Sequence, residues 1–362
     1  MEKLSDKDLT SILINLMYVK LLLAYPRIMI MIAGNASWIL SIYVTLIMLL
    51  IFFVLTKAYN FSRPILETAG KSFGKAFKLI IGVITVLMLM LSLTSIARIY
   101  PETVKIILLQ RTPFELIIFL FVLTAVIGAY IGIEAIGRIT SLFLPIAGAV
   151  MIFCLILLFP YMKISNLTPI LGKGVKSILV DGLTSISSFS DIIVIFILNL
   201  ESKNQKKIIK CGYKSIIVIG IIMTLILLSY SLIFPANISE NFLLPVYQLT
   251  RIIQIGDFFG RFEAFFEFVW SISVLLYFSI YIYTISIVWK ESFGMKYHKP
   301  LIFPLMILIM MFVMQSDSYT EMNAHYMWYS IALISVSVLI PLITGIAGKI
   351  RIKEGNDNIE NN

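Results

Sequence analysis

Ten long apolar runs make up most of the chain, and this pattern restricts it to a bundle of membrane-spanning helices. Of the 362 residues, 59% are hydrophobic and 14% are charged, and the mean hydropathy of +0.97 is far above that of soluble proteins. A helix needs roughly 20 apolar residues to cross the hydrocarbon core of a bilayer. We therefore expect an all-α integral membrane protein with about ten transmembrane helices, and not a barrel of strands. The runs are Leu9–Ile32, Trp38–Thr56, Phe77–Ile99, Phe114–Ile131, Ile139–Met162, Ile178–Leu200, Ser215–Phe234, Phe262–Trp289, Pro300–Gln315 and Trp328–Ile346.

The ten runs divide into two halves of five, about 9–162 and about 178–346, and the first run of each half is interrupted. Matching interruptions in two halves are typical of permeases built from inverted repeats. We expect a single transmembrane domain over residues 1–362, ending in a polar tail at 347–362. The longest polar stretch, Pro235–Arg261, is too short for an enzyme domain or a ligand-binding ectodomain. The chain is therefore not expected to be an enzyme, and a ligand must bind inside the bundle.

Basic residues are distributed unevenly between the two sides of the membrane. With the N-terminus inside, the inner segments carry nineteen Lys and Arg residues and the outer segments carry eight. Because positive charge is retained on the cytoplasmic side, both termini are expected in the cytoplasm. This bias accounts for the net charge of +9, with the basic loops facing lipid phosphates, so no nucleic-acid partner is expected. The first run is too long for a signal-peptide core and continues into Pro26-Arg27, so we expect it to be retained.

Two kinds of residue that often mark chemical sites are explained here by packing or by local pairing. Cys154 and Cys211 lie far apart in the chain, within or beside apolar runs, so neither a disulfide, a metal site nor a cofactor is expected. Glu134 and Arg138 are four residues apart, the spacing at which opposite charges pair along a helix.

The first run is interrupted near its middle by a cation and a proline. Pro26 removes a backbone donor and clashes with the carbonyl four residues earlier, which frees polar groups near Leu22. Lys20 lies at a depth where a cation costs roughly 2.5 to 3.5 kcal/mol on insertion scales, so it should face the interior of the bundle. Lys20, Leu22 and Tyr25 are candidate ligand-binding residues. Arg27 is closer to the outer interface, where it is expected to contact headgroups or a loop.

Lys20 has two interpretations that the sequence leaves open. Its side chain can snorkel, or it can pair with a carboxylate in a purely structural role. Alternatively its ammonium takes the place of a coupling cation, or a buried amine at this position carries a proton.

The sixth run opens with a polar stretch, 177–191, that is rich in serine and contains two aspartates and a glycine. Such a stretch predicts an unwound segment between two half-helices, whose free N–H groups and positive dipole end suit a carboxylate such as that of an amino acid. Asp191 lies deeper in the run than Asp181 and is a candidate partner for Lys20. The alternative is close packing, because small hydroxylated residues let helices approach and bond back to their own carbonyls. The candidate ligand-binding residues here are Thr184, Ser185, Ser187, Ser188 and Asp191.

Two further candidates come from the third and eighth runs, which line the pocket in folds of this type. Ser95 is one of several hydroxyl residues in the third run, and Tyr277 lies among those of the eighth. For each of them, packing is the alternative interpretation. Before the eighth run, the segment Pro245–Trp270 has an amphipathic helical pattern and is expected to lie along the outer surface, either as a lid or docking surface or as a plain interfacial helix.

Several short motifs occur together in an order that resembles one known family, the spore germination permeases, which are the B subunits of nutrient germinant receptors in the amino acid-polyamine-organocation superfamily. The resemblance covers nearly the whole chain. It rests on Pro26-Arg27 followed by Ala33-Gly34-Asn35-Ala36-Ser37-Trp38, the stretch Gly132–Pro145, Phe159-Pro160 with Asn166-Leu167-Thr168-Pro169-Ile170-Leu171, Pro245-Val246-Tyr247-Gln248-Leu249-Thr250-Arg251, Gly256-Asp257-Phe258 and Arg261-Phe262-Glu263-Ala264.

The resemblance implies a LeuT-like fold with broken first and sixth helices and residence in the inner membrane of bacterial endospores. It also implies assembly with a larger A subunit and a lipoprotein C subunit, and binding of a small nutrient, often an amino acid, at the breaks. One departure is notable, because the family has a glycine-rich approach to the first break where this chain has Val19, Lys20 and Leu21. The pocket is therefore expected to be narrower and partly filled by the protein's own charge.

Three functions remain open at this point. A receptor subunit would bind a nutrient and shift between conformations that its partners detect. A proton-coupled transporter would use the same site to carry an amino acid or a polyamine. A structural scaffold would support a partner receptor without binding the nutrient itself.

Overall fold

The computed structural model describes residues 4–23, 25–61, 64–198, 205–253, 262–315 and 319–360, without the side chains at 237, 319–327 and 351–360. Every regular element within these ranges is a helix, which confirms the all-α prediction. The α-helices are α1 Asp6–Leu23, α2 Tyr25–Ala33, α3 Ser37–Ala58, α4 Ile65–Phe73, α5 Lys75–Ile107, α6 Phe114–Ile131, α7 Ile133–Leu158, α8 Val175–Leu179, α9 Ile193–Ile197, α10 Gln205–Ile233, α11 Ala236–Ser239, α12 Pro245–Ile252, α13 Phe262–Phe293, α14 Lys299–Gln315 and α15 Tyr319–Glu360. The 3₁₀ helices are η1 Gly34–Ala36, η2 Phe159–Tyr161, η3 Ile164–Leu167 and η4 Asp181–Ile192.

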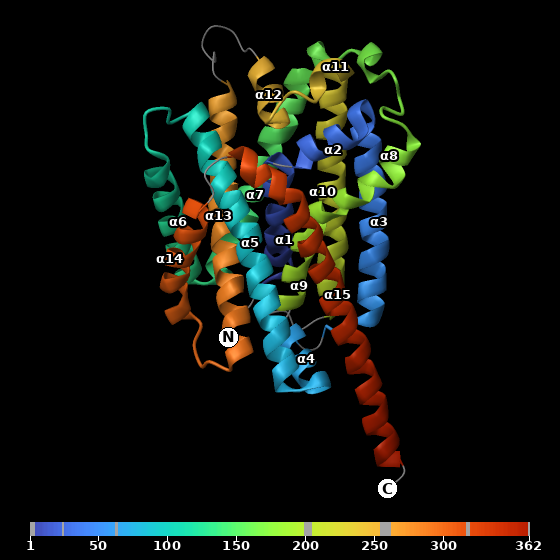
Figure 1. Ribbon diagram of the computed structural model, residues 1–362, viewed down its shortest axis with the longest axis vertical. Coiled ribbons are helices and arrows are strands. Elements are labelled where there is room, and N and C mark those ends of the chain that lie inside the picture. The colour runs from blue at the N-terminus through green and yellow to red at the C-terminus, as the bar shows by residue number, and fades with distance from the viewer. Residues whose placement is uncertain are drawn as a thin grey trace.

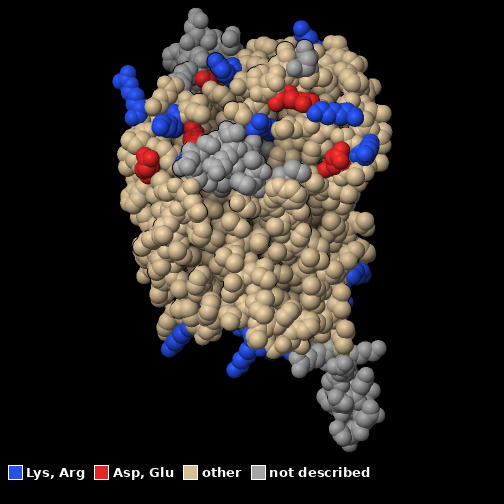
Figure 2. Space-filling model, viewed as in Figure 1, with Lys and Arg blue, Asp and Glu red and all other residues tan. Residues whose placement is uncertain are grey.

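The long helices stand side by side in one bundle, with α11 and α12 at one end (Figure 1). The start of α1 and the end of α15 lie at the opposite end, which we term the terminal end. Charged side chains gather near the two ends, and the belt between them is almost entirely uncharged in the view of Figure 2. Such a belt is what a hydrocarbon core requires, because water is absent there.

Within the described ranges, eight helical stretches are long and apolar enough to cross a membrane. The other two predicted spans are also helical but fall short of that standard. The first is divided into α1 and α2, and the 18 residues of α1 include four charged side chains. The ninth is α14, which has 17 residues. The expected polar tail is helical at least to Glu360, as part of α15, and residues 361–362 lie outside the described part.

Helix α1 runs through the middle of the bundle, packed against α7, α10 and α13 (Figure 1). All sixteen residues from Asp8 to Leu23 are buried. A helix that is buried on every side has no lipid-facing stripe, so its polar residues must find partners within the protein. Asn15 does so by donating a hydrogen bond of 3.0 Å to the carbonyl of Ser273 on α13. This central position of α1 places Lys20 in the interior, as the sequence predicts.

The outer segment is only partly described. Val246 and Leu249 of α12 are buried, which agrees with the amphipathic pattern, and the chain is described again from the start of α13. Residues 254–261, which belong to the same predicted surface helix, lie outside the described residues.

Local turns and close helix contacts depend on glycine. Gly132 connects α6 to α7 with a φ of +122°, a conformation that L side chains rarely adopt. Gly345 of α15 lies against the end of α3, where an added β-carbon would be 2.7 Å from the carbonyl oxygen of Ala58. In membranes, small residues allow backbones to approach and gain van der Waals contact.

We predict that Gly345→Ala lowers the thermal stability of the purified protein by about 1 to 3 kcal/mol, because the backbone of Ala58 cannot move aside as a flexible side chain can. The matched control is Gly148→Ala on α7, where an added β-carbon meets nothing within 4 Å. This control should be neutral or slightly stabilising, since alanine is the better helix former. Equal melting temperatures for the two variants in detergent would contradict the prediction.

Candidate functional site

The first predicted break lies between α1, which ends at Leu23, and α2, which begins at Tyr25. Helix α2 runs at an angle to α1 (Figure 1). Pro26 sits in the first turn of α2, where its missing N–H would have no partner within the helix in any case. The hydroxyl of Tyr25 donates a 3.2 Å hydrogen bond to the hydroxyl of Ser187, so the first break is joined directly to the sixth span.

The sixth span differs from the expectation of an unwound segment. It consists of the short helix α8, the 12-residue 3₁₀ helix η4 and the short helix α9. The hydroxyl groups stabilise this tighter winding by bonding to carbonyls three residues back, as Thr184 does to Asp181 (2.8 Å) and Ser187 does to Thr184 (2.6 Å). A 3₁₀ run of this length is uncommon, and mid-helix 3₁₀ stretches often mark functional hinges.

Winding at three residues per turn aligns every third side chain of η4. Ser185, Ser188 and Asp191 are spaced by three and therefore form one row, and all three are buried. In the part of the chain that the structure describes, the hydroxyls of Ser185 and Ser188 and one carboxylate oxygen of Asp191 have no hydrogen-bond partner. In an α-helix the same residues would be spread over about 120° of the helix surface, so the 3₁₀ geometry concentrates unused polar groups on one line.

An ion pair lies at the end of this row. The Nζ atom of Lys20 is 2.7 Å from Oδ1 of Asp191 and donates a second hydrogen bond of 3.1 Å to the hydroxyl of Ser190. The Lys20 side chain is 2% exposed and that of Asp191 is fully buried. The structure thus confirms Asp191 as the partner of Lys20. The pair carries no net charge, which is the condition under which two ions are tolerated in a low-dielectric interior.

A chain of hydroxyl groups approaches the ion pair from α13 and α5. The hydroxyl of Tyr281 donates to Asp191, and the hydroxyl of Ser92 lies 3.1 Å from that of Tyr281 and 3.3 Å from that of Tyr277. Since Tyr281 uses its proton on the carboxylate, Ser92 donates to Tyr281 and accepts from Tyr277. The two tyrosine rings are stacked with centroids 4.5 Å apart. This hydrogen-bonded chain orients the Asp191 carboxylate toward Lys20.

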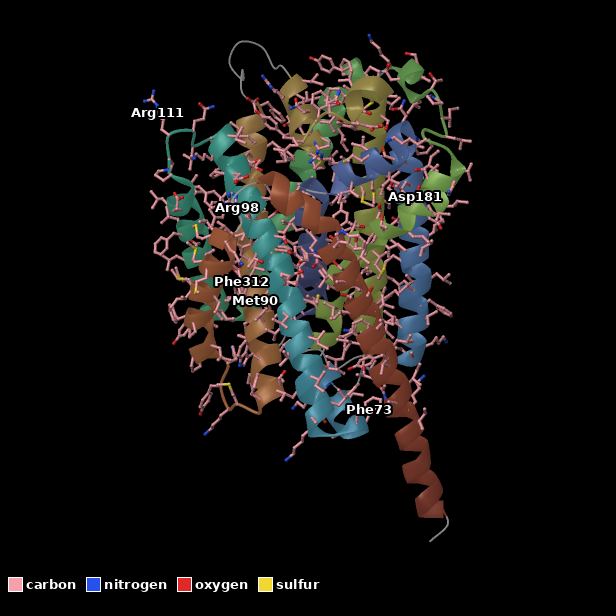
Figure 3. The ribbon with its side chains drawn as sticks, viewed as in Figure 1. Phe73, Met90, Arg98, Arg111, Asp181 and Phe312 are labelled. Atoms are coloured by element: carbon pink, nitrogen blue, oxygen red, sulfur yellow. The ribbon has the colours of Figure 1, made fainter. Side chains whose placement is uncertain are left out.

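The other predicted site residues are placed less centrally. Ser95 is buried but bonds back to the carbonyl of Leu91 at 2.7 Å. Thr184 is only partly buried and bonds back to Asp181, which lies on the flank of the bundle (Figure 3). Leu22 is buried and lines a small cavity beside the break, together with Val246 and Tyr247 of α12. A role of any of these residues in ligand binding remains a prediction.

Some residues of the site were not expected from the sequence. Ser190 and Tyr281 contact the ion pair, and Ser337 of α15 holds η4 by donating 2.7 Å to the carbonyl of Ser190. Tyr281 lies four residues after Tyr277, so the helical period was a usable signal. Glu267 was also overlooked, although a carboxylate within an apolar run is itself a signal of function.

Glu267 lines the small cavity above the break together with Leu22, Thr103, Tyr247 and Trp270. Its side chain is 2% exposed, and among the described residues neither its Oε1 atom nor the indole N–H of Trp270 has a hydrogen-bond partner. The cavity therefore offers one strong acceptor and one donor to a small polar group. A carboxylate of this kind suits an ammonium group, since an opposite charge compensates for its burial.

Two features explained by local pairing or packing behave as expected. Arg138 and Glu134 form an ion pair of 2.5 Å along α7. Cys154 and Cys211 are free, buried cysteines on different helices.

Apolar helices, an uncharged belt and a buried ion pair at the break of a central helix define a multi-pass membrane protein of the permease type. The family model for spore germination proteins matches residues 3–321, and the chain belongs to this family. It is 29% identical over 202 residues to spore germination protein A2 of Bacillus subtilis strain 168, an alignment that spans 54% of each chain. It is 26% identical over 203 residues to spore germination protein YndE of the same strain, spanning 55% of each chain. It is 23% identical over 256 residues to spore germination protein GerLB of Bacillus cereus, covering 69% of this chain and 68% of that protein.

We predict that the contributions of Lys20 and Asp191 to the stability of the protein are strongly coupled. Lys20→Met or Asp191→Asn alone leaves an unpaired buried charge and should cost about 3 to 5 kcal/mol of stability, whereas the double variant should lose much less than the sum. Melting temperatures of the four proteins in one detergent measure this coupling. The control cycle uses Glu134→Gln and Arg138→Gln, whose pair is exposed and should contribute less than about 1 kcal/mol. Additive losses at Lys20 and Asp191 would refute the coupling.

Proposed function

We propose that this protein is the membrane subunit of a spore germinant receptor and that it binds a small nutrient, such as an amino acid, where the breaks of the first and sixth spans meet. The observation that carries the proposal is the row of Ser185, Ser188 and Asp191, which presents unused polar atoms beside the break in α1. Family membership favours germination as the process in which this site acts.

The site also accounts for how a bound nutrient could produce a signal. Lys20 on α1, Asp191 on η4 and Tyr281 on α13 belong to three separate elements, and contacts between these side chains join them. A ligand that bonds Ser185 or Ser188 alters the position of η4 relative to α1. A ligand shifts a conformational equilibrium only by its difference in affinity between the states, and this junction is where such a difference arises.

Glu267 supports a nutrient that carries an ammonium group. Its free carboxylate oxygen and the indole N–H of Trp270 face a cavity that also contacts Leu22, two residues after Lys20. The ammonium group of a bound amino acid, which is small enough for this cavity of about 10 Å³, would pair with this carboxylate beside the break.

The proposal extends to the architecture of the protein, its membrane and its partner subunits. The ten predicted spans form a single LeuT-like domain of two inverted repeats, with the interrupted α1–α2 and α8–η4–α9 segments in equivalent positions. The protein resides in the inner membrane of the spore with both termini in the cytoplasm, in a complex with a receptor A subunit and a lipoprotein C subunit.

We predict that Ser188→Ala and Ser185→Ala each abolish stabilisation by the nutrient. The experiment is a thermal-shift screen of the purified receptor complex against amino acids, nucleosides, sugars and bile salts, followed by the variants with the active compound. Ser335→Ala is the control, because this exposed serine of α15 only bonds back to Ile331. Spores that carry Ser188→Ala should also lose their germination response. An unchanged response would favour the scaffold role instead.

A proton-coupled transporter of amino acids or polyamines is the second candidate, and the buried Lys20–Asp191 pair favours it because membrane proton relays use such ionisable groups. For a subunit that only senses, proteoliposomes containing the purified chain should show no concentrative uptake of radiolabelled amino acids or polyamines under a pH gradient. Uptake that is lost in Lys20→Ala would overturn the sensor-only function.

A further inference from the structure

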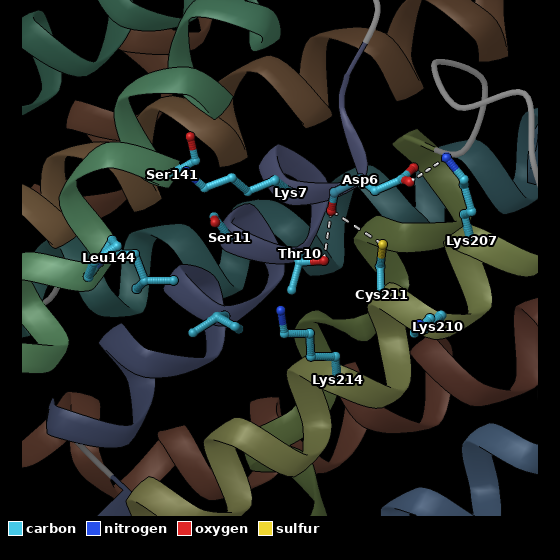
Figure 4. Close-up of a pocket in the computed structure, with 12 residues that line it drawn as sticks. Asp6, Lys7, Thr10, Ser11, Ser141, Leu144, Lys207, Lys210, Cys211 and Lys214 are labelled. Carbon is cyan, nitrogen blue, oxygen red and sulfur yellow. Dashed lines mark hydrogen bonds and ion pairs between the residues drawn. The ribbon is translucent and has the colours of Figure 1, made fainter.

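A cavity of about 580 Å³ lies away from the helix breaks, between α1, α7 and α10. It is lined by the first two turns of α1 and by the beginning of α10, at the terminal end of the bundle (Figures 1 and 4). We call it the basic groove, because four of its lining residues are lysines and one is an acid.

The lysines converge on the groove from two helices. Lys207, Lys210 and Lys214 follow the i, i+3, i+7 spacing of one helical face on α10, and Lys7 comes from α1. Figure 4 shows Lys7 extending toward Ser141 of α7 and Lys214 pointing toward α1 near Thr10. The four lysines therefore line one cavity.

Only one of these charges is neutralised inside the protein. Lys207 forms an ion pair of 2.9 Å with Asp6. Within the ranges that the structure describes, Lys7, Lys210 and Lys214 take part in no ion pair. Three like charges around one cavity repel one another, and an anion placed between them relieves that repulsion.

Part of the wall of the groove is apolar. It is formed by Ile14, Leu144 and Pro145. On either side of this stretch of α7, Leu142 and Ile146 are 70% and 56% exposed, as expected of a surface that faces acyl chains. The groove thus combines cationic side chains with an apolar wall, and it lies beside a helix surface that is expected to face lipid.

We propose that the basic groove binds an anionic phospholipid, with the headgroup phosphate held by Lys7, Lys210 and Lys214 and an acyl chain lying along Ile14, Leu144 and Pro145. Basic pockets between transmembrane helices bind anionic headgroups in this way. A soluble phosphate would use the lysines and leave the apolar wall without a ligand, so the combination of both surfaces selects the lipid.

The test measures the melting temperature of the full-length protein in detergent during titration with dioleoylphosphatidylglycerol, dioleoylphosphatidylcholine or sn-glycerol 3-phosphate. Phosphatidylglycerol should raise the melting temperature with a saturable dependence. Phosphatidylcholine, which has no net charge, and glycerol phosphate, which has no acyl chain, should have little effect. An equal rise with either of these compounds would overturn the lipid proposal.

Substitutions then locate the effect. Lys210→Gln/Lys214→Gln should raise the half-saturating concentration of phosphatidylglycerol about 30-fold, since each lysine near an anionic headgroup contributes about fivefold. Lys210→Arg/Lys214→Arg should bind like the wild type. The matched control, Lys75→Gln/Lys78→Gln, removes two charges from the start of α5 at the same end of the bundle (Figure 1). An unchanged affinity for phosphatidylglycerol in Lys210→Gln/Lys214→Gln, or an equal loss of affinity in Lys75→Gln/Lys78→Gln, would overturn the proposal.

If the glutamine double variant fails to fold, counting of bound phosphatidylglycerol by native mass spectrometry on Lys214→Gln replaces the titration. Loss of a tightly bound lipid relative to the wild type supports the groove, and an unchanged count refutes it.

Discussion

A cation in the middle of a membrane bundle must be matched by an anion, and much of this protein's interior is arranged around that requirement. Lys20 pairs with Asp191 in the buried interior, where Lys20 donates a further hydrogen bond to Ser190 and Asp191 accepts one from Tyr281. Removing one ion of such a buried pair is strongly destabilising, because it leaves the other charge uncompensated. The central helix, the 3₁₀ segment and α13 are therefore held to one mutual arrangement by a few side chains.

The sequence predicts the location of this site well and its geometry less well. Pro26 and the charge of Lys20 identify the first break, and the density of serine identifies the sixth, because both patterns conflict with a lipid-facing helix. The pairing of Lys20 with Asp191 could be predicted because Asp191 lies deeper in its run than Asp181. The 3₁₀ winding of η4 could not be predicted, since serine side chains bond to carbonyls three or four residues back and thus support several windings.

Other features depend on tertiary contacts that composition does not encode. Tyrosine is also common at packed interfaces, so the presence of Tyr281 in its run does not by itself indicate a bond to Asp191. That bond becomes evident only when α13 is placed beside η4. A count of membrane spans from hydropathy likewise misses helices that other helices shield from lipid. The charged residues of α1 lower its apolarity, although all of its residues from Asp8 to Leu23 are buried. A buried helix can carry polar residues that a lipid-facing helix cannot, provided that neighbouring helices supply the partners.

The winding of η4 also has a mechanical consequence. A 3₁₀ helix rises about 2.0 Å per residue and an α-helix about 1.5 Å, so the 12 residues of η4 span about 6 Å more than they would as an α-helix. Rewinding this segment would also turn Ser185 by about 120° relative to Asp191, because each of the six intervening steps changes from 120° to 100°. A local change of winding would therefore both shift the helices at its two ends along the segment and rotate them relative to each other, without any hinge between domains.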